Sequence, residues 1–167
     1  MDPLIIGGLA VVLYIATRTA GSNAYRASRH FTFAELSRTN TGLPNNPPPE
    51  AKAWLEATAQ EVLEPIRQRF GVIQVTSGYR SQEVNTRIGG SPTSQHMLGQ
   101  AADIVSPTAT PYEIVNWIYT TSLPVRQVIL YPPSEGNFVH VAIDPNRPAK
   151  RQFLQKNGAF AEWRPSS

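Results

Sequence analysis

Residues 94–105 have the sequence SQHMLGQAADIV, in which a loop histidine is closely followed by a short strand that carries an acid. The predicted strand runs from Ala101 to Val105, and its period-two alternation turns Asp103 away from the face that Ile104 occupies. A carboxylate in an apolar strand is costly to bury unless it is paired or binds a metal ion. Asp103 and the preceding loop residue His96 therefore begin a candidate site.

A second apolar strand, FVHVAI, is predicted over Phe138 to Ile143. Alternation places His140 on the face opposite Val139 and Val141. A single histidine in a strand is most often structural, and that alternative stays open for His140 taken alone. Here an acid and a histidine, in two separate strands, both point away from the core. This arrangement favours a site in which the two side chains bind one common ligand.

The chain contains no cysteine, so any metal ion must be held by nitrogen and oxygen atoms. His96, Asp103 and His140 together supply three such donors. Three protein ligands with a fourth position left to water are typical of a catalytic zinc site. Small residues at Gly99 and Ala101 would let the loop and the strand approach one ion.

The remaining pattern mixes helices and strands without regular alternation, which favours an α+β fold with a small, mainly antiparallel sheet and helices packed around it. The zinc site is expected at the face of this sheet. Further strands are predicted over Val72–Thr76 and Gln127–Tyr131. Helices are predicted from Thr32, from about Pro49 to Phe70, over Ser81–Ile88 and over Thr110–Thr120. Pro65 should kink the long helix or split it after Glu64.

Four segments are predicted along the 167 residues. Residues 1–20 form an apolar N-terminal helix, residues 21–30 a linker, residues 31–145 the zinc domain, and residues 146–167 a C-terminal extension. Three aromatic residues are expected to pack this extension onto the domain: Phe153, Phe160 and Trp163. Residues 165–167 are expected to be disordered.

The N-terminal run Leu4–Thr17 is uncharged and strongly apolar. Fourteen helical residues rise about 21 Å, which is short of a bilayer's hydrocarbon core unless the helix continues beyond Arg18. A membrane anchor is the favoured interpretation. A cleaved signal peptide and a core or assembly helix are the alternatives. The arginines that follow the run argue against simple export by the positive-inside tendency, a conflict that a virus-associated membrane would ease.

The net charge of +3 is modest, and Lys150-Arg151 is the only adjacent pair of basic residues. Such a surface could attract nucleic acid, an anionic membrane or an anionic wall polymer. No aromatic-rich basic stripe accompanies the charge, so nucleic acid is not an expected partner.

Several short motifs occur in a defined order: SGYRS at 77–81, GGS at 89–91, SQH at 94–96, GQAADI at 99–104 and VHV at 139–141. Together they resemble the zinc D-Ala-D-Ala carboxypeptidase family, which includes vancomycin-resistance dipeptidases and phage L-Ala-D-Glu endolysins. The family pattern is a histidine, an aspartate seven residues later and a distant second histidine. The resemblance covers Phe31 to Ile143 and implies a hedgehog/D-Ala-D-Ala peptidase-like fold.

The resemblance also implies roles for individual residues. His96, Asp103 and His140 would bind Zn²⁺. Arg80 would stabilise the polarised carbonyl or bind a substrate carboxylate, unless it is an ordinary surface arginine. Ser94 would contact substrate, unless its hydroxyl only caps the loop.

One departure from the family concerns the general base. Several members place an acid three residues before the last histidine, where this chain has Asn137. An amide cannot accept a proton from zinc-bound water at neutral pH. Glu135 is the nearest acid and is the predicted base. The alternatives are a solvated loop carboxylate with another acid acting as base, or an inactive site.

The expected function is zinc-dependent hydrolysis of peptide bonds in peptidoglycan stem peptides, by a D,D-carboxypeptidase or an endopeptidase, with a phage lysis or entry enzyme included. The expected location is membrane-associated through the N-terminus, acting at the periplasm or cell wall, or virion-associated. The alternative is a zinc-containing, non-catalytic wall- or protein-binding module in a membrane or virion. A structural envelope protein could coexist with either.

Overall fold

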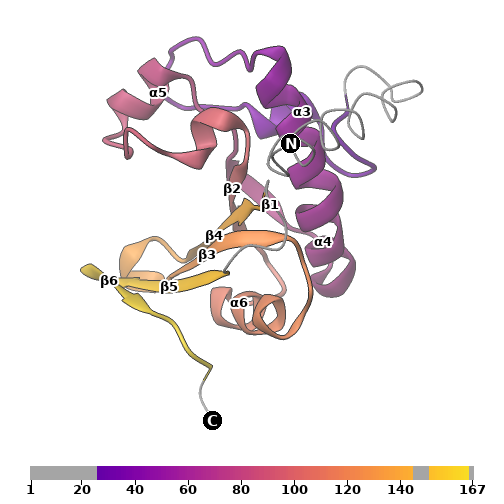
Figure 1. The fold of residues 1–167 in the computed structure, drawn as a ribbon, viewed down its shortest axis with the longest axis vertical. Coiled ribbons are helices and arrows are strands. Elements are labelled where there is room, and N and C mark those ends of the chain that lie inside the picture. The colour runs from indigo at the N-terminus through magenta and orange to yellow at the C-terminus, as the bar shows by residue number, and fades with distance from the viewer. Residues whose placement is uncertain (1–25, 145–150, 166–167) are drawn as a thin grey trace, which may run out of the picture.

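The computed structural model describes residues 26–144 and 151–165, so the predicted N-terminal helix and the first half of the predicted linker lie outside the described residues. Helices pack around one twisted sheet, and a lobe of loops and short helices stands beside it (Figure 1). Within the described ranges, no helix is both long enough and apolar enough to cross a membrane.

The sheet has six strands in the order β1-β2-β4-β3-β5-β6. All neighbouring pairs are antiparallel except β3 and β5, which run parallel. The prediction of an α+β fold with a mainly antiparallel sheet is confirmed, although the sheet is larger than expected. The strands are β1 (Gln74–Ser77), β2 (Ala101–Val105), β3 (Val125–Tyr131), β4 (Phe138–Ile143), β5 (Gln152–Asn157) and β6 (Ala159–Glu162).

The bounds of β2 and β4 agree with the sequence prediction, whereas β1 begins two residues later than predicted. The first residue of β1, Gln74, pairs with Val105, the last residue of β2. The pairing partner therefore sets where β1 begins. The strand propensity of residues 72–76 does not predict this starting point.

The helices are α2 (Phe33–Leu36), α3 (Pro49–Thr58), α4 (Glu64–Phe70), α5 (Gln82–Arg87) and α6 (Pro111–Thr120). A π-helical turn over Ala59–Leu63 joins α3 to α4, and Pro65 lies in the first turn of α4. Proline has no N–H for a helical hydrogen bond, and the wider turn absorbs this loss. The long helix thus changes type immediately before Glu64, one residue earlier than the predicted split.

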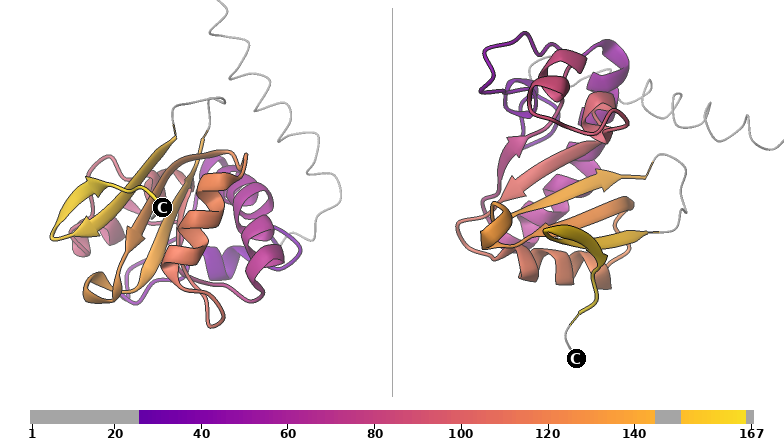
Figure 2. Two further views of the ribbon diagram at one scale, coloured as in Figure 1. Left: turned by 90° about the horizontal axis from the view of Figure 1, so that it is seen from below. Right: turned by 90° about the vertical axis from the view of Figure 1, so that its left-hand side faces the viewer.

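One face of the sheet carries the hydrophobic core. Residues such as Ile104, Val128 and Val141 are fully buried against the helices. The helix α6 covers this face at β3 and β4, α3 covers it at β2 and β4, and α4 packs beside α6 (Figure 2). The opposite face is left to the lobe that contains α5, so the candidate site lies on the side without long helices.

The C-terminal segment completes the sheet as a hairpin of β5 and β6. Arg151 donates to the carbonyl oxygens of Thr121 at 2.7 Å and Ile118 at 2.5 Å, at the end of α6, where basic groups are favourable. Phe153 and Trp163 are buried as predicted, but the prediction for Phe160 is wrong because 55% of its surface is exposed. Phe160 lies on an edge strand and turns to the face away from α6.

Candidate metal centre and cleft

Asp103 and His140 meet because β2 and β4 are adjacent antiparallel strands in which these two residues are register partners. The Nδ1 atom of His140 lies 2.9 Å from Oδ1 of Asp103. Both side chains are buried, with 7% of each residue exposed. The alternation predicted from sequence puts both on the face opposite the hydrophobic core, and the register then brings them together.

His96 reaches the same point from a short 3-10 turn, η2 (Gln95–Leu98), which ends at Gly99. Its Nε2 atom lies 3.2 Å from Nδ1 of His140 and 3.2 Å from Oδ1 of Asp103. The three side chains form a buried group that could hold one metal ion. The structure thus brings together all three predicted ligands.

Two glycines allow the close approach of this turn and of the loop after β1, which carries the Gly78 carbonyl. Gly99 has φ +73°, and a Cβ there would lie 2.3 Å from the carbonyl oxygen of Ala51 in α3. At Gly78 a Cβ would lie 2.1 Å from the carbonyl oxygen of Leu36. Any other residue at either position would push the loop away from its neighbouring backbone.

The tautomer of His96 can be inferred from its second nitrogen. Nδ1 lies 2.7 Å from the carbonyl oxygen of Gly78, which can only accept a hydrogen bond. Nδ1 therefore carries the proton, and Nε2 presents a lone pair to Asp103 and His140. A backbone carbonyl that orients a histidine in this way is a common support for metal ligands.

The donor atoms fit a small divalent cation. Zinc–nitrogen and zinc–oxygen bonds are about 2.0–2.1 Å, so two ligands on a tetrahedron lie about 3.3 Å apart. The observed separations of the three donors are 2.9, 3.2 and 3.2 Å. Lone pairs this close repel unless a cation or proton lies between them. Nε2 of His140 is also buried, and it has no hydrogen-bond partner among the described residues.

The electrostatics of the group favour the ligating protonation states. Burial by itself would raise the pKa of Asp103, but His96 and His140 outweigh burial and hold that pKa well below its usual value. Burial lowers the pKa of His140 and outweighs the hydrogen bond that His140 donates to Asp103, which would raise it. An ionised carboxylate and neutral imidazoles are the forms that bind metal.

Arg80 lies beside this group, in the loop after β1. Its Nη2 atom donates to Oδ2 of Asp103 at 2.6 Å, and its Nε atom donates to Ser77 Oγ at 2.8 Å. Only 14% of the Arg80 side chain is exposed, so it is not an ordinary surface arginine. The guanidinium holds the second oxygen of Asp103 and leaves the first one turned toward the histidines.

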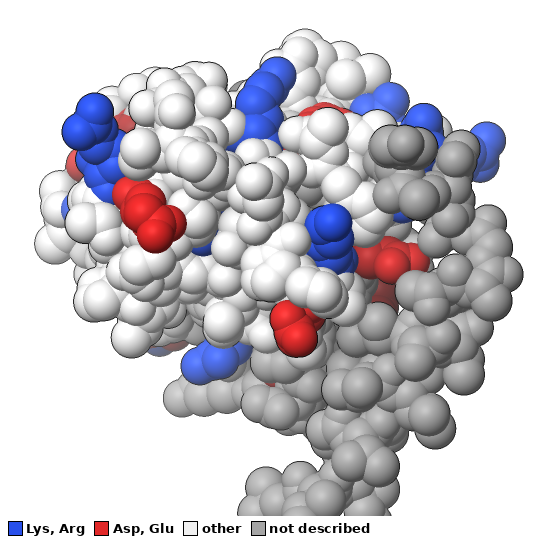
Figure 3. All heavy atoms as spheres, turned by 90° about the horizontal axis from the view of Figure 1, so that it is seen from above, with Lys and Arg blue, Asp and Glu red and all other residues white. Residues whose placement is uncertain are grey.

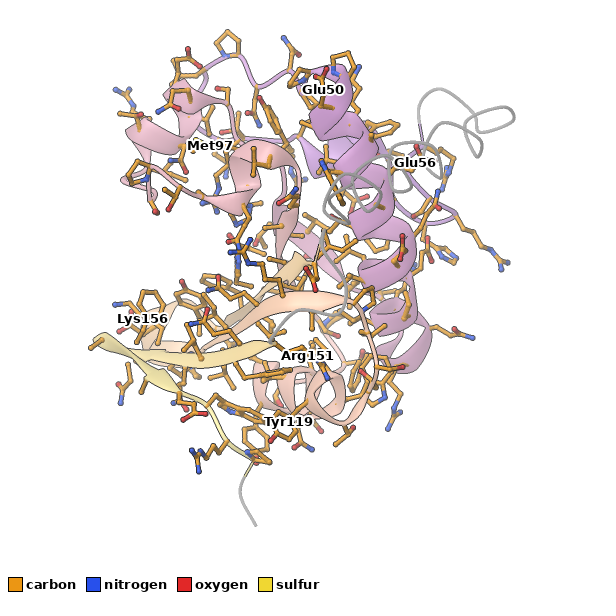
Figure 4. All side chains as sticks on the ribbon, viewed as in Figure 1. Glu50, Glu56, Met97, Tyr119, Arg151 and Lys156 are labelled. Atoms are coloured by element: carbon orange, nitrogen blue, oxygen red, sulfur yellow. The ribbon has the colours of Figure 1, made fainter. Side chains whose placement is uncertain are left out.

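These residues form the floor of a cleft of about 780 Å³ between the sheet and the lobe that contains α5. Ser94 lines the cleft, and its hydroxyl does not cap the η2 turn. The cations Arg80 and Arg126 line the cleft, and Asp103 is the single carboxylate among the described residues of the lining. Figure 4 places Met97, in the η2 turn, above this region and Lys156, on the β5–β6 hairpin, below it.

Glu135 does not join the group. It lies in the short turn η3 (Pro133–Glu135) and does not line the cleft. Its Oε1 atom accepts a hydrogen bond at 2.7 Å from the backbone N–H of Gly158, in the β5–β6 turn. Its role as general base therefore stays a prediction. The sequence did not predict the hydrogen bond between Glu135 and Gly158, because no local motif indicates that the hairpin packs against this turn.

Asn137 has a conformational explanation. Its φ is +56°, and it is the only non-glycine residue with positive φ among those described. Asparagine tolerates this left-handed conformation better than glutamate does. The departure from the family pattern at this position therefore coincides with a backbone requirement of the turn that leads into β4.

A pair of histidines and an aspartate, converging on the open face of an α+β sheet, defines the class of single-metal-site proteins. Within that class, the chain belongs to the Peptidase M15 family, whose sequence model matches residues 29–142. It is also similar to a zinc D-Ala-D-Ala carboxypeptidase from Streptomyces albus G, with 36% identity over 78 residues. This stretch covers 45% of the chain and 31% of that relative, so the chain matches less than a third of the relative's length.

Proposed function

We propose that the protein is a zinc-dependent peptidase that hydrolyses peptide bonds in peptidoglycan stem peptides. The observation that carries this proposal is the buried donor group of His96, Asp103 and His140 at the floor of an open cleft. Family membership and the similarity to a zinc D-Ala-D-Ala carboxypeptidase support it.

His96, Asp103 and His140 hold the Zn²⁺ ion in this proposal. Bound zinc supplies two kinds of chemistry, since it lowers the pKa of a water ligand to about 7 and polarises a carbonyl oxygen. Gly78 keeps Nε2 of His96 unprotonated, and Arg80 keeps the Asp103 carboxylate in place. These supporting contacts set the geometry of the ligands before substrate arrives.

Arg80 also faces the substrate. It uses Nε and one Nη2 hydrogen on Ser77 and Asp103, and a guanidinium has five N–H donors in total. The remaining donors can bind a substrate carboxylate or a developing oxyanion. Ser94 offers a hydroxyl in the lining of the same cleft. The excess of cations in the lining suits the carboxylates of a stem peptide.

The direct test is digestion of purified muropeptides by the zinc-loaded protein, with products identified by mass spectrometry. Cleavage should stop with a chelator and return with added zinc. The identity of the cleaved bond would separate carboxypeptidase from endopeptidase action. If the zinc-loaded protein cleaves no muropeptide, the peptidase proposal is wrong.

A specific observation also favours a second candidate, a zinc-containing binding module without peptidase activity. Among the described residues that line the cleft, Asp103 is the only acid, and it faces the histidines. A module of this kind would bind peptidoglycan fragments in calorimetry and leave them intact in the digestion assay.

A further inference from the structure

The cleft extends well beyond the metal group, along the face of the sheet. His140 in β4 is paired with Ile129 in β3, Ile129 with Leu154 in β5, and Leu154 with Glu162 in β6. The side chains of Ile129 and Leu154 line the cleft with His140. The hairpin thus continues the same surface by two more strands.

Aromatic rings extend along this surface from β4, beside the metal group, to β6. Tyr131 and Phe138 are register partners whose rings stack with centroids 4.0 Å apart. The ring of Phe160 meets Tyr131 edge-on at 6.4 Å, and all three residues line the cleft. An exposed phenyl ring inside a cleft that is otherwise rich in polar groups is a typical anchor for ligand.

The position of Phe160 is held by contacts from several sides. The Lys156 ammonium lies 4.9 Å from the centre of its ring and donates to the carbonyl oxygen of Gly158. Gly158 in turn donates to Glu135 at 2.7 Å, and Arg151 ties the start of β5 to α6. The hairpin is therefore anchored at both ends, and the ring is presented in a defined place.

The distance from the metal group indicates how long a ligand must be to reach this ring. Three steps between neighbouring strands separate β4 from β6, and at about 4.8 Å each they span roughly 14 Å. An extended peptide covers about 3.4 Å per residue, so about four residues are needed. A terminal dipeptide bound at the metal group would leave Phe160 without a contact.

We propose that the β5–β6 hairpin forms a distal subsite, in which Phe160 and Leu154 bind the part of an extended stem peptide about four residues from the scissile bond. This inference rests on the proposed function and names its substrate class, a peptide longer than the terminal dipeptide. Residues 152–162 lie beyond the family match, which ends at residue 142, so this subsite is a feature that the match does not describe.

The test compares Phe160→Ala with wild type on two substrates, an N-acetylated D-Ala-D-Ala dipeptide and a full stem peptide. The expected result is a loss of about tenfold in kcat/KM on the stem peptide, with the dipeptide rate changed less than twofold. Tyr112→Ala is the matched control, because Tyr112 is a 40% exposed aromatic residue on α6, at the opposite face of the sheet. Equal effects of Phe160→Ala on both substrates, or no effect on either, would overturn the subsite.

Binding provides a second readout that does not depend on turnover. Titration calorimetry with the stem peptide should show about tenfold weaker affinity for Phe160→Ala than for wild type. If wild type cleaves neither substrate, the peptidase proposal fails, and this titration still decides the subsite. Unchanged affinity of Phe160→Ala for the stem peptide would overturn the proposed subsite. A loss of affinity for peptide-free glycan alone would also overturn it, because the hairpin would then bind sugar. Circular dichroism checks that each variant is folded.

Discussion

The Nδ1 atom of His140 lies 2.9 Å from Oδ1 of Asp103, because the two residues are directly opposed on the neighbouring strands β2 and β4. Two of the three donor residues therefore lie on paired strands, which are rigid elements. His96 completes it from a turn held by two close backbone approaches at Gly78 and Gly99. A site built mainly on strands keeps its geometry without substrate.

Removal of one ligand should abolish metal binding. In His140→Ala, we expect the zinc content to fall from about one ion per chain to less than about 0.1, since two remaining ligands bind zinc weakly. His30→Ala is the control, because His30 pairs with Glu64 away from the cleft. Plasma mass spectrometry of the purified proteins measures this content. Full zinc occupancy in His140→Ala would contradict the ligand assignment.

Metal removal should lower thermal stability. A ligand that binds only the folded state at 1,000 times its Kd contributes about 4 kcal/mol, which is roughly 10 °C in Tm for a domain of this size. We expect a chelator to lower Tm by about that amount in scanning calorimetry and added zinc to restore it. Magnesium should restore nothing, because two imidazoles are poor ligands for it. A Tm indifferent to chelation would argue against a zinc site.

Arg80→Lys should impair activity while leaving the fold intact. Arginine contacts Asp103 and Ser77 simultaneously through Nη2 and Nε, and a lysine ammonium cannot reproduce that fork. Loss of one charged hydrogen bond is worth about 1.5–3 kcal/mol, so we expect kcat/KM to drop about 10- to 100-fold. Arg87→Lys, on the exposed side of α5, is the control and should match wild type. Steady-state kinetics on muropeptides decides the point.

Glu135→Gln tests the general-base prediction. The amide oxygen of glutamine can still accept the hydrogen bond from Gly158, so the hairpin anchor is retained while proton acceptance is lost. For a general base we expect kcat on muropeptides to fall by about 100-fold or more in steady-state kinetics.

Glu135→Ala is the companion variant, because it removes the anchor as well. If Glu135→Gln keeps wild-type turnover and only Glu135→Ala loses rate on long peptides, the residue positions the hairpin and is not the base.

Glu64 should make stability depend on acid pH. Burial would raise the pKa of Glu64, but hydrogen bonds from His30 and Ser28 outweigh burial and hold that pKa below its ordinary value. A depressed folded-state pKa adds stability above the unfolded value, and this stability is lost as pH falls through the folded one.

We therefore expect Glu64→Gln to cost at most about 1 kcal/mol at pH 7 and nothing well below pH 4. Urea unfolding at several pH values measures the difference. Glu162→Gln, at a side chain 70% exposed, is the control. A deficit that persists unchanged at low pH would contradict the charge-based explanation.

The distribution of surface charge indicates less about function than the cleft does. On the face drawn in Figure 3, Lys and Arg side chains are dispersed among Asp and Glu, and the described residues there form no continuous cationic patch. This agrees with the scattered basic residues in the sequence. The predictions about a membrane anchor, and about location in a cell envelope or virion, concern residues outside the described ranges and stay predictions.

Local patterns in the sequence were sufficient for several elements. The helix predicted over Thr110–Thr120 forms as α6, with Thr110 at the N-cap and Pro111 at the first helical position. The structure adds a capping box between Thr110 and Glu113. Strand alternation correctly separated Asp103 and His140 from the core-facing residues. These features depend on neighbours within a few residues, where steric and hydrogen-bonding preferences are strong.

The sequence by itself predicted the faces of β2 and β4 and most helix ends, because these follow from local periodicity and capping. Strand alternation also indicated Asp103 and His140 as candidate donors, whereas His96 was added from its loop position and from the ordered motifs. Only the tertiary structure decided that β5 pairs in parallel with β3, that Glu135 binds Gly158, and that Phe160 faces the cleft. Pairings between distant segments depend on the packing of the whole sheet, and that information is absent from any short window of sequence.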